Sequence, residues 1–104
     1  RGQVWHYDPR RSTFTLELLF RGDDGADGPD NISVSPYGGV IIAEDGGGAN
    51  HLVAAAEDGT TSRIARSERG GEFTGPVFSA DGRVLFANVQ VPGTMFAITG
   101  PWGR

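Results

Sequence analysis

An internal repeat is the feature that most limits the folds open to this chain. Residues 35–43 read SPYGGVIIA and residues 79–87 read SADGRVLFA, so the two segments align without a gap, with Ser35 matched to Ser79. Serine, glycine, valine and alanine recur in register, and the two positions between valine and alanine are apolar in both copies. A repeat of about 40–50 residues built from short strands is typical of a β-propeller blade. The repeat therefore predicts two similar β-units.

Short strand-like segments separated by turn signals fill the rest of the chain. The 17 glycines are too many for a helical domain and fit tight turns between strands. The single helix candidate, residues 54–57, is cut short by Asp58 and Gly59. Nine strands are predicted, within residues 4–7, 14–20, 32–35, 39–43, 51–56, 61–65, 73–79, 83–89 and 95–99. The predicted fold class is therefore all-β.

The number of strands predicts a partial β-propeller with about two four-stranded antiparallel blades. Residues 1–20 would form the outer strands of one blade, residues 30–65 one whole blade, and residues 73–99 most of the next. Propellers close with about four to eight blades, so 104 residues are too few to close one alone. A β-sandwich with two similar hairpins is the alternative.

Acidic and amide side chains gather at one end of a predicted hairpin. Tyr37 and Gly38 mark a two-residue turn between the apolar runs 32–35 and 39–43. Four oxygen-bearing side chains flank the open end of this hairpin: Asp30, Asn31, Glu44 and Asp45. Carboxylates gathered in this way are hard to ionise together unless a cation or water lies between them. The sequence thus predicts an oxygen-ligand site suited to Ca²⁺, Mg²⁺, Mn²⁺ or iron.

A simpler interpretation of the same residues is structural. Asp30 would cap a turn and Asn31 would satisfy backbone groups, as both residue types commonly do in loops. Each of the two histidines, His6 and His51, lacks a second metal-binding neighbour in the sequence and is interpreted as a strand or turn residue.

Composition and motifs exclude several classes of function. The net charge of −4 is spread along the chain, which argues against a nucleic-acid surface. Without cysteine there is no disulfide and no thiolate metal site. The printed residues hold no signal peptide and no transmembrane run, so no membrane partner is predicted, and a targeting segment upstream of Arg1 stays open. No nucleophile-elbow or phosphate-loop motif is present, and no catalytic residue is assigned.

Several motifs, in order along the chain, resemble the C-terminal part of the PhoX-type alkaline phosphatases. They are VWHYDP at 4–9, PDNISVSP at 29–36, AEDG at 43–46, EFTGP at 72–76, FSADGR at 78–83, NVQ at 88–90 and FAITGPW at 96–102. This resemblance covers nearly the whole chain. It implies a six-bladed propeller that hydrolyses phosphate monoesters with Ca²⁺ and Fe³⁺ at its channel. It also implies export by a twin-arginine signal, to the periplasm or outside the cell.

The resemblance further implies which residues bind metal, because the family's Asp-Asn and Glu-Asp-Gly motifs supply acidic ligands. The metal candidates are Asp30 and Glu44 first, followed by Asn31, Asp45 and Glu72. One departure is Ala43, where the family often has cysteine. The blades that would bring the remaining ligands and a substrate-binding arginine are absent from these residues. The chain is therefore interpreted as a C-terminal portion that is inactive by itself, with a phosphate ester as substrate of the complete enzyme.

Two other functions stay open. The first is a non-catalytic binding or self-assembly module derived from a propeller, because open blades leave unpaired strand edges that favour self-association. The second is a lactonase or another propeller hydrolase with one Ca²⁺, which would share the acidic channel mouth. The terminal motifs resemble the phosphatase family more closely.

Overall fold

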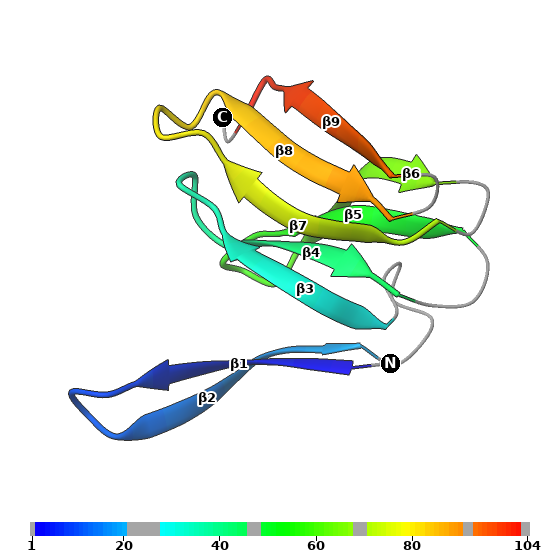
Figure 1. Ribbon diagram of the computed structural model, residues 1–104. Coiled ribbons are helices and arrows are strands. Elements are labelled where there is room, and N and C mark those ends of the chain that lie inside the picture. The colour runs from blue at the N-terminus through cyan, green and yellow to red at the C-terminus, as the bar shows by residue number, and fades with distance from the viewer. Residues whose placement is uncertain (1, 21–27, 46–48, 68–70, 91–92, 103–104) are drawn as a thin grey trace.

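The computed structural model describes residues 2–20, 28–45, 49–67, 71–90 and 93–102 (Figure 1). The strands are β1 (Gly2–Asp8), β2 (Thr13–Phe20), β3 (Pro29–Val34), β4 (Val40–Glu44), β5 (Asn50–Ala55), β6 (Thr61–Ser67), β7 (Phe73–Phe78), β8 (Val84–Val89) and β9 (Thr94–Thr99). The described residues contain no helix, and so none long and apolar enough to cross a membrane. The predicted all-β class is confirmed, and each predicted strand overlaps an observed one.

The strands form three open sheets in which consecutive strands pair antiparallel. The sheet orders are β1-β2, β3-β4-β5-β6 and β7-β8-β9. In Figure 1 the three-stranded sheet lies over the four-stranded sheet, with β7 packed against β3, β4 and β5. The β1-β2 hairpin lies beyond the other side of the four-stranded sheet. The described strands close into neither a barrel nor a propeller, so the assignment of the sheets as blades stays a prediction.

The four-stranded sheet carries the core because both of its faces are covered. Ile41 of β4 packs with Leu85 on the side of the three-stranded sheet, whereas Ile42 packs with Phe20 on the side of the hairpin. Successive residues of a strand point to opposite faces, so the four apolar residues 40–43 of β4 all pack in a core cluster. This explains why the segment around Ile41 reads as a continuous apolar run rather than an alternating one.

The sequence repeat is reproduced in the two turns. The Gly38 amide donates to the Ser35 carbonyl at 3.2 Å, and the Gly82 amide donates to the Ser79 carbonyl at 2.9 Å. Both glycines have positive φ, which side chains with a Cβ rarely adopt. The first turn is longer than the predicted two-residue loop, because the Ser35 amide donates to the Gly39 carbonyl at 3.0 Å. Residues 36–38 therefore form a three-residue loop.

The register of the strand pairing beside each turn differs by one residue between the two repeats. Val34 lies opposite Val40, but its repeat equivalent Phe78 lies opposite Leu85 rather than Val84. The second turn is one residue longer, with the Ser79 amide bonded to the Val84 carbonyl at 2.8 Å. A one-residue shift reverses the faces of a strand. Consequently β4 and β8 direct equivalent apolar residues toward each other, and these form one core cluster.

Candidate metal centre

A β-bulge in β3 sets the direction of Asp30. Pro29 lies opposite Glu44 and Asn31 lies opposite Ala43, so Asp30 is an extra residue between two successive pairs. Bulges of this kind redirect a side chain and bend the strand. The Asp30 side chain therefore does not follow the regular alternation of β3. It lies at the open end of the hairpin.

Backbone hydrogen bonds hold the other two acidic residues near this bulge. The Asp45 amide, directly after β4, donates to the Gly28 carbonyl at 2.7 Å, which keeps Asp45 beside the start of β3. Glu72 directly precedes β7, and its carbonyl accepts a hydrogen bond of 3.2 Å from the Gln90 amide. Because β7 packs across β3 and β4, Glu72 reaches the hairpin end from the neighbouring sheet.

Asn31 fixes how β7 crosses β3. Its Oδ1 accepts one hydrogen bond from Thr74 Oγ1 at 3.1 Å and another from the Gly75 amide at 2.8 Å. Both donors lie in β7, two and three residues after Glu72. The amide of Asn31 therefore couples the position of Glu72 to that of Asp30.

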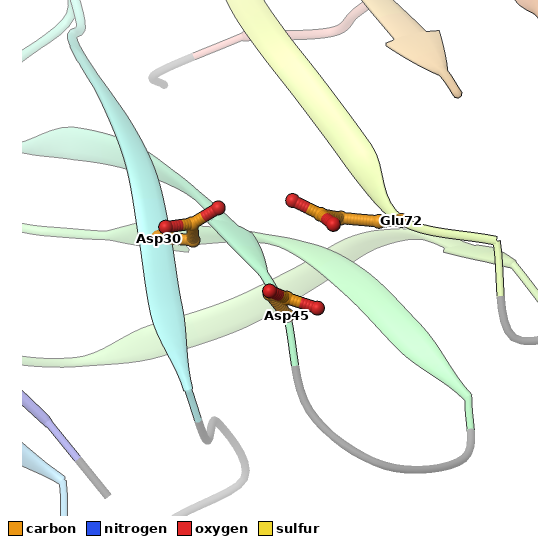
Figure 2. A group of neighbouring side chains, drawn as sticks. All are labelled: Asp30, Asp45 and Glu72. Carbon is orange, nitrogen blue, oxygen red and sulfur yellow. The ribbon is translucent and has the colours of Figure 1, made fainter.

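Three carboxylates converge at this crossing, as Figure 2 shows. Ligand oxygens of Asp30, Asp45 and Glu72 lie within 4.8 Å of one another. Asp30 and Asp45 are exposed, and Glu72 is half-buried. Two oxygens bound to one Ca²⁺ at about 2.4 Å can be up to about 5 Å apart, so one cation can contact all three. Within the described ranges, no other three histidine or acidic side chains come this close.

The proximity of these carboxylates raises the pKa of Glu72. The largest cause is a hydrogen bond between the Glu72 and Asp30 side chains, followed by burial and then by the negative charge of Asp45. A proton on Glu72 therefore relieves the repulsion in the metal-free protein. A cation at the same place would remove the need for that proton.

This raised pKa predicts a pH dependence of stability in the absence of metal. A carboxyl whose pKa is higher in the folded than in the unfolded state stabilises the fold when it is protonated. The contribution of Glu72 is complete below its ordinary value of 4.5 and is lost as the pH rises through its higher folded pKa. We expect the urea midpoint of the metal-free protein to fall as the pH is raised through this range.

The Glu72→Gln variant should lack this fall, and a fall of equal size in the variant would contradict the assignment. Two other shifted carboxyls do not interfere. Hydrogen bonds with Thr60 lower the pKa of Asp58, and hydrogen bonds with Arg83 and Ser79 lower the pKa of Asp81. The stability that these two residues contribute is lost only at pH values below their ordinary 3.8.

Glu44 has a different environment from the three converging carboxylates. It is 5% exposed, and its Oε1 accepts a hydrogen bond of 2.9 Å from the His51 amide. The same oxygen lies 2.7 Å from Nδ1 of the His51 ring, which is also buried. Neighbouring residues at a strand end diverge, so Glu44 and Asp45 do not point to the same place.

The structure thus brings together three of the five predicted metal candidates. Asp30, Asp45 and Glu72 converge, Asn31 lies beside them with its oxygen bonded to β7, and Glu44 bonds to His51. That any of the five binds a metal stays a prediction. The interpretation of His51 as a strand residue is confirmed, but its contact with Glu44 was missed. The register of the β4-β5 hairpin was the signal that could have revealed this contact. Because Ala43 pairs with Leu52, the adjoining residues Glu44 and His51 become neighbours.

The fold and the site together define an all-β protein of stacked antiparallel sheets with an acidic cluster where two sheets cross. The chain belongs to the PhoX alkaline phosphatase family, whose family model matches residues 1–93. No curated protein and no solved structure gives a match to this chain. The family resemblance stated from the motifs is thereby confirmed, and with it membership of a phosphatase family.

Proposed function

We propose that Asp30, Asp45 and Glu72 bind a calcium ion, and that this chain is the C-terminal portion of a metal-dependent phosphatase of the PhoX type. The observation that carries the proposal is the convergence of three carboxylates from three separate segments within 4.8 Å. Membership of the family supplies the reaction, which is hydrolysis of a phosphate monoester. The substrate class is therefore a phosphate ester.

The donor set fits calcium because all of its atoms are carboxylate oxygens. Iron also accepts carboxylates, so Fe³⁺ is the second metal that the proposal includes, with donors beyond these three. A cation bound here would polarise a phosphoryl oxygen or activate water. The residues of this chain would fix its position: Asp30 and Asp45 from the hairpin, and Glu72 from the second sheet. Asn31 would keep the two sheets at the required crossing.

The number of metal ligands also indicates that the chain does not complete an active site. Calcium takes about six to eight oxygen ligands, and three carboxylates supply only part of that number. The remaining positions would be filled by water, by substrate oxygens or by residues of other blades. We therefore infer that the isolated chain binds the cation without turning over a phosphomonoester.

The proposal also takes the three sheets as parts of propeller blades. What supports it is the four-stranded meander β3-β6, its partial repetition in β7-β9, and the packing of these two sheets face to face. Residues 1–20 would be the outer strands of one blade, residues 30–65 a whole blade and residues 73–99 most of the next. Export to the periplasm or the medium is proposed from the family alone.

Calcium binding is the direct test of the proposed site. We expect calorimetry to show one Ca²⁺ bound per chain, and the Glu72→Gln variant to bind at least about tenfold more weakly, because a charged ligand is lost. The control is Asp58→Asn, since Asp58 is an exposed turn residue bonded to the Thr60 amide at 2.9 Å. Equal affinities in Glu72→Gln and Asp58→Asn would overturn the assignment of the site.

Turnover is the test of incompleteness. With Ca²⁺ and Fe³⁺ added, the isolated chain should hydrolyse p-nitrophenyl phosphate no faster than buffer. Turnover above background that disappears in Glu72→Gln would show a complete active site. It would reject the inference that the isolated chain is inactive. Turnover that survives in Glu72→Gln would reject the proposed role of these carboxylates altogether.

A further inference from the structure

The third strands of the two larger sheets have different neighbours. In the four-stranded sheet, β5 is followed by β6, which covers its outer edge. In the three-stranded sheet, β9 is the last strand, and no residue of the described ranges pairs with its outer edge (Figure 1). The outer edge of the third strand is therefore covered in one sheet, at β5, and open in the other, at β9.

The sequences of β6 and β9 indicate that only β6 is built as an outer strand. Outer strands commonly carry charged side chains that discourage further pairing. The β6 strand reads TSRIARS and contains Arg63 and Arg66, whereas β9 reads TMFAIT and contains no charge and no proline. An uncharged β-prone segment of this kind is typical of a strand with a neighbour on each side.

Phe96 shows what the open edge leaves uncovered. It lies opposite Ala87, which is fully buried on the face toward the four-stranded sheet. Directly paired residues share a face, yet Phe96 is 45% exposed. The next residue on the same face, Ile98, is only half-buried. The exposure of Phe96 therefore comes from the open edge rather than from the wrong face.

A cavity of about 500 Å³ lies between the outer parts of the two sheets, close to this edge. Its lining includes Ser62 and Ile64 from β6, Ile98 and Thr99 from β9, and the rings of Phe78 and Trp102. A strand added beside β9 would have alternate side chains on this side. The cavity offers these side chains an apolar environment.

Residues 100–102, directly after β9, leave its edge accessible. Trp102 Nε1 donates to the Arg83 carbonyl at 2.8 Å, and the Trp102 ring stacks on Tyr37 with centroids 6.4 Å apart. These contacts turn residues 100–102 back toward the two hairpin turns. They also supply part of the cavity wall.

We propose that the outer edge of β9 binds an extended polypeptide strand of the β6 type, paired antiparallel to β9. Its apolar residues would enter the cavity and contact Phe96, and its charged residues would form the new outer edge. Main-chain hydrogen bonds would supply the affinity and the cavity the selectivity, as in other cases of strand addition. The proposal is independent of the metal site.

The probe is a synthetic peptide that copies residues 58–67, which contain β6 and its preceding turn. The full chain is labelled with ¹⁵N and titrated with the peptide. We expect saturable shifts of the β9 amides and about tenfold slower hydrogen exchange along β9, because edge amides become hydrogen-bonded. A scrambled peptide of the same composition should leave these amides unchanged.

Two N-methylated peptides separate strand pairing from adhesion of apolar side chains. Alternate amides of a β-strand point to opposite edges, so each peptide is methylated at one alternate set. One of them should lose binding and the other keep it. Equal binding by both would overturn the proposal.

Phe96→Glu supplies the matched protein variant. It should bind the peptide about tenfold more weakly, because a carboxylate would be desolvated at the new contact. Phe14→Glu, at a residue that is 69% exposed on β2, should bind normally. A spectrum that is unchanged away from the substituted residue shows that each variant is folded.

Two further results would overturn the proposal. The first is the absence of any chemical-shift change at the β9 amides with about 2 mM peptide. This result would exclude even the weak affinity expected of strand addition. The second is slow exchange of β9 without peptide, together with a dimer in sedimentation. That result would identify the occupant as a second copy of this chain.

Discussion

Gly39→Ala is expected to lower the free energy of unfolding by about 3 kcal/mol or more, because left-handed strain and a backbone overlap add together. Gly39 has a φ of +74°, a conformation that costs a residue with a Cβ about 1–2 kcal/mol. A Cβ at this position would also overlap the Ala55 carbonyl oxygen, a backbone atom of the β4-β5 ladder. The overlap cannot be relieved by a side-chain rotation, so the ladder itself must shift.

Gly59→Ala is the matched control for this prediction. Gly59 also has a positive φ, +89°, but a Cβ there has no atom within 4 Å. Only the conformational cost remains, so we expect the free energy of unfolding to fall by about 1 kcal/mol. Urea unfolding followed by tryptophan fluorescence measures both variants. Similar losses in the two variants would show that the approach of Gly39 to Ala55 is unimportant.

His51→Leu is the second change expected to have a large effect. The free energy of unfolding should fall by about 2–3 kcal/mol, because a buried side-chain hydrogen bond is lost and its remaining partner stays buried. The His51 ring and the Glu44 carboxylate are both buried and lie 2.7 Å apart. Removing the ring leaves Glu44 with fewer hydrogen-bond partners in an apolar environment. Because Glu44 immediately precedes Asp45, this variant should also weaken calcium binding at the proposed site.

The second histidine of the chain supplies the control. His6 lies 3.6 Å from Glu17 on the exposed β1-β2 hairpin, and its side chain is 64% exposed. Surface pairs of this kind contribute at most about 1 kcal/mol, so His6→Leu should change the urea midpoint little. If His51→Leu were as mild as His6→Leu, the buried pair would not stabilise the fold.

The position of the strands could be predicted because it depends on local features. Turn residues such as Gly38 and Gly82 adopt backbone conformations that few other residues tolerate, and they separate apolar runs of strand length. Hairpin pairing follows from short connections, so the sequence alone places Asp30 and Asp45 at one end of a hairpin. The family motifs lie in these same segments, which is why the family could be recognised from them.

The choice among the acidic candidates could not be predicted in this way. Glu44 was one of the two first candidates, with Asp30, but strand alternation and the His51 contact separate it from the converging group. Glu72 was one of the three weaker candidates, yet the packing of β7 across β3 brings it to Asp30. The bulge that directs Asp30 has no sequence signature in this chain.

The sequence by itself determined the all-β class, the strands of the described segments, the antiparallel hairpins and the acidic end of the β3-β4 hairpin, because each depends on residues close along the chain. The tertiary structure decided the register of β8, the faces of β4 and β8, and the partners of Asp30. These depend on one extra residue in a turn and on how two sheets pack. A one-residue shift reverses every side chain of a strand, and it is selected by the burial of apolar residues such as Leu85 between sheets.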